Sequence, residues 1–161
     1  MSTTLKKGDI APAFQSTLSD GTSLTLSSLK GKKVILYFYP KDNTPGCTKE
    51  ACDFRDSWKD FQKSDAVVLG VSRDSHTSHH TFKSLFSLPF TLLSDETGEI
   101  SESYGTWVEK SMFGKKYFGL ERSTFLIDEK GKIQKIWRKV KVLGHVQKVL
   151  QEALTSPSHI G

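Results

Sequence analysis

The residues in this sequence that could do chemistry are two cysteines, Cys47 and Cys52, which lie five positions apart. A cysteine acts as a nucleophile only as its thiolate, so its reactivity depends on what surrounds the sulfur. Two cysteines cannot form the disulfide scaffold of a domain of this length, and they do not supply the four ligands of a structural zinc site. The pair is therefore either chemically active or simply buried as small apolar side chains.

The sequence before Cys47 predicts that this residue lies in the first turn of a helix. Thr44 is a suitable N-cap residue, and Pro45 is favoured at the first helical position. Cys47 would then be the third helical residue, where free backbone N–H groups and the positive end of the helix dipole favour an anion. Such conditions lower the pKa of a cysteine thiol from ~8.5 into the range ~3.5–7.5.

The apolar pattern of the same helix places Cys47 on its inward face. Spacings of 4, 3, 4 and 3 form one apolar stripe, made of Cys47, Ala51, Phe54, Trp58 and Phe61. On this pattern alone, Cys47 can also be one more small core residue. Two features favour a chemical role: the helix start, and the loop in front of it, where two prolines and a glycine fix the backbone beside the sulfur.

Strand-like and helix-like patterns alternate along the chain around this helix. We expect strands at 34–39, 66–71 and 123–128, a hairpin partner at 132–138, and a small hairpin of 14–18 and 23–26 around the turn Ser19-Asp20-Gly21. Helical patterns fall at about 45–63, 76–87, 98–104 and 143–154. This order predicts an α/β fold with a central mixed β-sheet flanked by helices. Sites in such sheets gather at the carboxyl ends of parallel strands, which is where residues 40–47 lie.

Length and composition predict one domain, residues 1–154, followed by a loose C-terminal tail, residues 155–161. No apolar run approaches the ~18 residues of a membrane span. Residues 1–9 lack the apolar core of a signal peptide, so we expect a cytoplasmic protein.

The formal net charge is +5, but basic and acidic residues are interleaved along the chain. In the most basic stretch, 132–141, basic residues alternate with apolar ones. We therefore expect a solvated strand face there, and neither a nucleic-acid nor a membrane partner.

The loop and helix around Cys47 resemble the peroxiredoxin family. Pro40, Thr44 and Cys47 match its motif Pro-x3-Thr-x2-Cys, which alone would be weak. The longer string 37–56, YFYPKDNTPGCTKEACDFRD, closely resembles the bacterioferritin comigratory protein branch, also called peroxiredoxin Q. The likeness continues through 88–95, 104–107, 110–116 and the run RSTFLID at 122–128, and it covers nearly the whole chain except the tail.

This resemblance implies a thioredoxin-like fold and a monomer that reduces hydrogen peroxide and organic hydroperoxides without a cofactor or metal. It assigns the peroxidatic role to Cys47, which becomes a sulfenic acid. It assigns the resolving role to Cys52, which forms an intramolecular disulfide that thioredoxin or a similar dithiol recycles. It implies that Thr44 and Arg122 hydrogen-bond the thiolate and the peroxide, while Pro40 shields the sulfur from water. Some relatives carry the resolving cysteine in the helix after the second buried strand, but residues 76–87 contain none.

The spacing of the two cysteines has a consequence for this implied disulfide. Within one α-helix, residues five apart are separated by ~7.5 Å of rise and ~140° of rotation, so their Cα atoms lie roughly 8.6 Å apart. A disulfide needs Cα atoms within about 7 Å. We therefore expect residues 46–53 to unwind after Cys47 is oxidised.

Three other classes of function remain as alternatives. A thioredoxin-type disulfide exchanger would normally show Cys-x-x-Cys, whereas the spacing here is Cys-x4-Cys. A cysteine hydrolase needs a histidine base, and no histidine sits in a recognisable context; His76, His79 and His80 together predict a solvated helix face. A non-enzymatic binding module predicts that alkylation of Cys47 leaves function intact.

Overall fold

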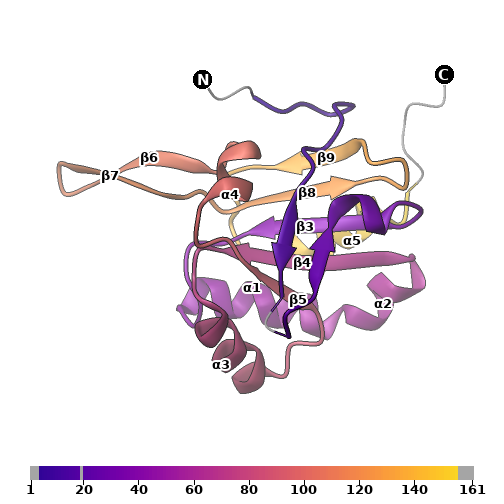
Figure 1. The fold of residues 1–161 in the computed structure, drawn as a ribbon, viewed down its shortest axis with the longest axis horizontal. Helices are drawn as coiled ribbons and strands as arrows, with labels where there is room; N and C mark the ends of the chain where they lie inside the picture. Colours follow the sequence, from indigo (N-terminus) through magenta and orange to yellow (C-terminus); the bar gives the residue numbers. More distant parts are fainter. Residues whose placement is uncertain (1–3, 19, 156–161) are drawn as a thin grey trace.

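The computed structural model describes residues 4–18 and 20–155, which fold around a five-stranded β-sheet (Figure 1). The strand order is β5-β4-β3-β8-β9, and the strands are β3 (Lys33–Phe38), β4 (Ala66–Ser72), β5 (Thr91–Ser94), β8 (Ser123–Ile127) and β9 (Ile133–Trp137). β3 pairs in parallel with β4 and antiparallel with β8, so the sheet is mixed. The predicted α/β architecture with a central mixed sheet is confirmed.

The central strand β3 is buried on both faces, as its continuous apolar run predicts. Ile35 and Tyr37 belong to the hydrophobic cluster on one face, which α1 and α5 help to build. Val34, Leu36 and Phe38 belong to the cluster on the other face. Figure 1 shows α1, α2 and α5 on one side of the sheet and the β1–β2 hairpin with α4 on the other. The carboxyl end of β3 therefore emerges between two packed layers.

The predicted long helix after Pro45 is two helices, α1 (Pro45–Asp56) and α2 (Trp58–Lys63), separated by Ser57. Ser57 has φ −100° and ψ 8°, outside helical geometry, and it is buried. The apolar stripe nevertheless faces the core, because Cys47, Ala51, Phe54 and Phe61 are all buried. The other predicted helices match α3 (His76–Phe86), α4 (Glu99–Ser103) and α5 (His145–Ala153).

The small N-terminal hairpin is also confirmed, as β1 (Gln15–Thr17) and β2 (Ser23–Thr25), although Ser19 of its predicted turn lies outside the described residues. A short 3-10 helix, η1 (Leu26–Leu29), follows it. Of the predicted tail, 156–161 lies outside the described residues, and Thr155 accepts a hydrogen bond at its carbonyl from the Lys33 ammonium at 2.6 Å. In residues 4–18 and 20–155, no helix is long and apolar enough to cross a membrane.

Sequence reasoning missed a second hairpin, formed by β6 (Trp107–Met112) and β7 (Lys115–Leu120). It projects from the body of the molecule (Figure 1), and most of its residues are exposed, so it carries no apolar alternation that would predict strands. Two residues separate β7 from β8 (Ser123–Ile127), whose first residue, Ser123, pairs with Phe38 at the end of β3. The hairpin and the loop before α1 therefore lie at the same end of the sheet.

Candidate active site

Cys47 is the third residue of α1, and its side chain is almost fully buried, as the sequence predicts. Thr44 occupies the N-cap position with an extended backbone, and Pro45 takes the first helical position. The Thr44 hydroxyl does not cap the helix; it donates a hydrogen bond to the Lys41 carbonyl at 2.9 Å. The first-turn backbone N–H groups beside the sulfur are thus left without a cap from Thr44, which suits an anion at this position.

Arg122 brings a fixed positive charge to this sulfur from the other side of the site. It immediately precedes β8, and its Nη2 donates to Cys47 Sγ at 3.4 Å. Gly46 makes room for this contact, because a Cβ on Gly46 would lie 3.1 Å from Arg122 Nη2. The two residues that the resemblance joins at the thiolate, Cys47 and Arg122, are therefore in contact.

Glu50 holds the other end of the guanidinium, a residue that sequence reasoning missed. Arg122 Nη1 donates to Glu50 Oε1 at 2.7 Å, and Glu50 is fully buried. Burial raises the pKa of the Glu50 carboxyl from its ordinary value of 4.5 to about 7, although Arg122 acts in the opposite direction. The signal was available, since Glu50 lies three positions after Cys47 and so on the same helix face.

Cys47 belongs to the same buried hydrophobic cluster as the aromatic residues Tyr37 and Phe54. Tyr37 on β3 is fully buried and stacks on Phe54 of α1 with ring centroids 4.6 Å apart. Lys110 on β6 adds a second cation near the site, and its ammonium donates to the Leu120 carbonyl. Burial lowers the pKa of Lys110, as does Arg122 beside it, while negative charge at Cys47 acts the other way. A thiolate at Cys47 is therefore buried, in contact with Arg122 and within the electrostatic influence of Lys110.

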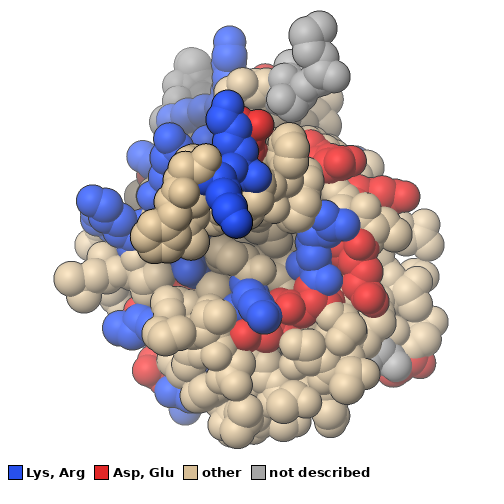
Figure 2. All heavy atoms as spheres, turned by 90° about the vertical axis from the view of Figure 1, so that its left-hand side faces the viewer, with Lys and Arg blue, Asp and Glu red and all other residues tan. Residues whose placement is uncertain are grey.

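Positive charge also gathers on the surface of the molecule around the β6–β7 hairpin. Figure 2 views the molecule from the side on which the β6–β7 hairpin projects, and it shows Lys and Arg gathered in the upper half of this face. Asp and Glu lie mainly along its right side. Anions are therefore favoured over the upper part of this face.

Neither Cys52 nor Pro40, the remaining residues implied by the resemblance, takes part in the hydrogen bonds of Arg122 with Cys47 and Glu50. Cys52 is half-buried further along α1, and both cysteines are free thiols in an intact helix. Pro40 is exposed at the end of β3, and its role as a shield for the sulfur stays a prediction. Two histidines of the described residues are buried, and both are engaged away from Cys47: the Nε2 of His145 lies 2.8 Å from the Thr124 hydroxyl, and His79 contacts Asp42. A histidine base for a hydrolase is therefore not formed by either of them.

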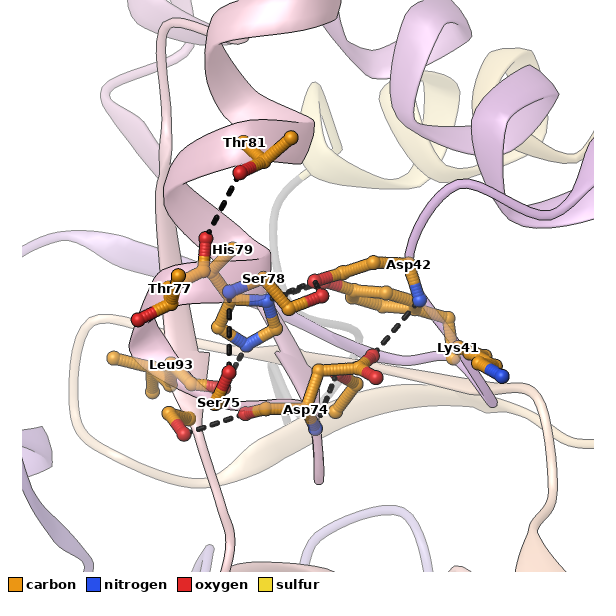
Figure 3. A network of polar contacts seen from close by, with 12 residues as sticks. Lys41, Asp42, Asp74, Ser75, Thr77, Ser78, His79, Thr81 and Leu93 are labelled. Carbon is orange, nitrogen blue, oxygen red and sulfur yellow. Dashed lines mark hydrogen bonds and ion pairs between the residues drawn. The ribbon is translucent and has the colours of Figure 1, made fainter.

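The prediction that His76, His79 and His80 form a solvated face is wrong for His79. His76 is half-buried and His80 is exposed, but His79 is buried on the inward side of α3 (Figure 3). Its Nδ1 lies 2.7 Å from Asp42 Oδ2, and its Nε2 lies 3.0 Å from the Leu93 carbonyl. These partners come from distant parts of the chain, so the local pattern could not reveal them.

Asp42, Asp74 and His79 place ligand-type atoms within 4.8 Å of one another, a spacing that could hold a metal ion. Each of these atoms already has a protein partner. Asp74 Oδ2 accepts from the Ser72 hydroxyl at 2.6 Å and from the Asp42 backbone N–H at 2.8 Å. A metal would have to displace these bonds, so the cluster is better described as a hydrogen-bond network.

Comparison with known proteins gives this geometry a context. The model of the AhpC/TSA family matches residues 7–136. A putative peroxiredoxin Bcp of Coxiella burnetii is 57% identical over 146 residues, which cover 91% of this chain and 97% of that protein. Two solved structures from Xanthomonas campestris each have a TM-score of 0.83 and cover 87% of this chain and 89% of the other. One is peroxiredoxin Q, at 44% identity, and the other is a bacterioferritin comigratory protein described by its alkyl peroxide reduction activity, at 43% identity.

Replacement of Glu50 by Gln tests the electrostatics of this site. With its pKa raised to about 7 in the folded protein, Glu50 contributes stability that is fully present below 4.5 and is lost as pH rises through about 7. Glu50→Gln removes this ionisation, so the stability of the parent relative to the variant should fall between about pH 5 and about pH 8. Urea unfolding of both proteins across this range measures the difference. A difference that does not change with pH would show that Glu50 does not titrate there.

Proposed function

Because the chain belongs to the AhpC/TSA family and has a thioredoxin-like fold, it is a thiol-dependent peroxidase, and we propose that Cys47 is the residue that attacks the peroxide. The observation that carries this proposal is the 3.4 Å contact between Arg122 Nη2 and Cys47 Sγ at a buried helix start. A helix N-terminus and a guanidinium on one sulfur both favour the thiolate, which is the nucleophilic form.

The proposed reaction needs the Cys47 thiolate and a hydrogen-bond donor near the peroxide oxygens. The thiolate of Cys47 attacks one oxygen of the peroxide, the O–O bond breaks, and the other oxygen leaves as hydroxide or alkoxide and takes up a proton. The sulfur is oxidised to a sulfenic acid, and the peroxide is reduced to water or an alcohol. Arg122 donates toward the negative charge that develops on the oxygens, which lowers the barrier.

Thr44 suits the role of orienting the peroxide. Its hydroxyl already donates to the Lys41 carbonyl at 2.9 Å, so its lone pairs remain available as acceptors. A peroxide O–H can therefore donate to Thr44 while the thiolate attacks the adjacent part of the molecule. Pro40, at the opposite end of the same loop, would limit the access of water. The proposed substrates are hydrogen peroxide and organic hydroperoxides.

We further propose that Cys52 resolves the sulfenic acid. Its thiolate attacks the Cys47 sulfur, the S–O bond breaks, hydroxide leaves and takes up a proton to become water, and an intramolecular disulfide forms. Both cysteines lie in α1, where an ideal helix holds their Cα atoms roughly 8.6 Å apart and points the side chains to different faces. The bond cannot form in that helix, so its first turns must open. Oxidation favours the opening, because a neutral sulfenic acid no longer interacts with Arg122 as a thiolate does.

The cycle closes when an external dithiol reduces the disulfide. One thiolate of thioredoxin or a similar reductant attacks the Cys47–Cys52 bond, and its second thiol releases the reduced enzyme. An opened α1 exposes the disulfide, so the same motion serves resolution and recycling. The proposed enzyme works as a monomer, as the resemblance to peroxiredoxin Q implies.

Replacement of Cys47 by Ser tests the proposed function. A serine hydroxyl is not ionised at neutral pH, so Cys47→Ser should remain folded and lose peroxide consumption to the background rate. The measurement is peroxide consumption with a thioredoxin system, with circular dichroism as the control for folding. Peroxide consumption by Cys47→Ser near the rate of the parent would remove Cys47 from the mechanism.

Hydrogen exchange tests the opening of α1. The oxidised protein should exchange amides of 46–53 faster than the reduced protein, with less helical signal, because the disulfide excludes the helix. Cys52→Ser is the control: it should be oxidised once at Cys47 without forming the disulfide, exchange the amides of 46–53 more slowly than the oxidised parent, and fail to turn over with thioredoxin. The mechanism is wrong if a Cys47–Cys52 disulfide coexists with a fully protected helix, or if Cys52→Ser turns over with thioredoxin like the parent.

A further inference from the structure

The loop 40–44 determines where α1 begins, and it contains a single buried residue, Asp42. Asn43 follows with φ 58°, in the left-handed region, and turns the chain into Thr44 and the helix. Such a conformation is uncommon for a residue other than glycine and persists only where surrounding contacts hold it. The position of Cys47 therefore depends on what holds Asp42.

Asp42 is held by groups from three separate parts of the fold (Figure 3). Its Oδ1 accepts from the hydroxyl of Tyr39, the residue directly after β3, at 2.6 Å. Its Oδ2 accepts from the Ser78 hydroxyl at 2.8 Å and contacts His79 Nδ1 at 2.7 Å, both on α3. Its backbone N–H donates to Asp74 Oδ2 at 2.8 Å, in the turn between β4 and α3. The loop is thus fixed to α3 through one carboxylate.

The hydrogen bonds of His79 define its charge. Nδ1 faces the Asp42 carboxylate, and Nε2 faces the Leu93 carbonyl at 3.0 Å. Both partners are acceptors, so the ring satisfies both only when both nitrogens carry a proton. Burial alone would raise the pKa of Asp42, but the hydrogen bonds from His79, Tyr39 and Ser78 together lower it. The contact is therefore a buried ion pair, with side chains only 5% and 3% exposed.

We propose that the Asp42–His79 ion pair is a positioning device for Cys47, which sets the distance between the start of α1 and Arg122. Arg122 belongs to the β8 side of the site, so its 3.4 Å contact with the sulfur depends on how the loop and the sheet are placed relative to each other. A displacement of about 1 Å at a reacting group can cost ~10²-fold in rate. This inference rests on the proposed role of Cys47.

The same ion pair fixes one boundary of the proposed opening of α1. Asp42 precedes the segment 46–53, and its partners lie directly after β3, on α3 and in the β4–α3 turn rather than on α1. The loop therefore stays in place while the helix opens. When the disulfide is reduced, the helix re-forms from a fixed starting point, with Cys47 returned to Arg122.

The test compares Asp42→Asn with a matched variant, Asp95→Asn. Asp95 is an equally buried carboxylate that accepts from the backbone N–H groups of Ile100 and Ser101, at 3.1 and 2.8 Å, at the start of α4. Both substitutions remove a buried charge with several hydrogen bonds, so both should lower thermal stability. Only Asp42→Asn should slow Cys47 oxidation, by ~10- to 100-fold at a temperature where the variant is fully folded. Rapid mixing with hydrogen peroxide measures the second-order rate constant.

His79 supplies a second, independent pair of variants. The amide N–H of Asn can replace the Nδ1 donor, so His79→Asn should recover part of the rate that His79→Phe loses. Nitrogen-15 NMR of the parent should show both His79 ring nitrogens protonated. The proposal would be overturned if Cys47 of folded Asp42→Asn or His79→Phe were oxidised at the parental rate. An equal loss of rate in Asp95→Asn would also overturn it. The Cys47 role is judged separately, by Cys47→Ser and by the reactivity of the parent.

Discussion

The site depends on one interaction, the contact between the Cys47 sulfur and the Arg122 guanidinium. The sulfur must carry negative charge to react, and the guanidinium always carries positive charge. Arg122 meets Cys47 at 3.4 Å in a nearly dry space, where charge interactions are stronger than in water. The same burial makes an unpaired charge costly. Glu50 therefore pairs with the other end of the Arg122 guanidinium. Gly46, with no side chain, leaves the space in which the two groups meet.

The sheet explains how two residues 75 positions apart in the sequence reach this contact. β3 ends at the loop that leads to Cys47, and its antiparallel neighbour β8 begins immediately after Arg122, so the register Phe38–Ser123 brings both to one end of the sheet. Helix α3 fixes the loop from the side through Asp42. The scaffold thus places a helix start, a cation and an anchored loop around a single sulfur.

The sequence was most informative where local pattern and burial coincide. The apolar runs of β3, β4 and β8 and the stripe of α1 correctly predicted the core, the sheet and the inward position of Cys47. Prediction failed where contacts between distant parts of the chain determine the structure. Ser57 divides the predicted helix in two, and the exposed β6–β7 hairpin lacks the apolar alternation of a strand. His79 is buried by partners on β5 and in the loop before α1. Glu50 was missed although its spacing from Cys47 places it on the same face.

The rate at which peroxide oxidises Cys47 in Arg122→Lys tests this account most directly. Lysine keeps a positive charge but loses the planar fork that contacts Cys47 and Glu50 at once. One donor in such a site typically contributes ~10²–10³ in rate, so the second-order rate constant from rapid mixing should fall by about that factor while the protein stays folded. A rate constant equal to that of the parent would contradict the claim that the guanidinium contact makes this sulfur reactive.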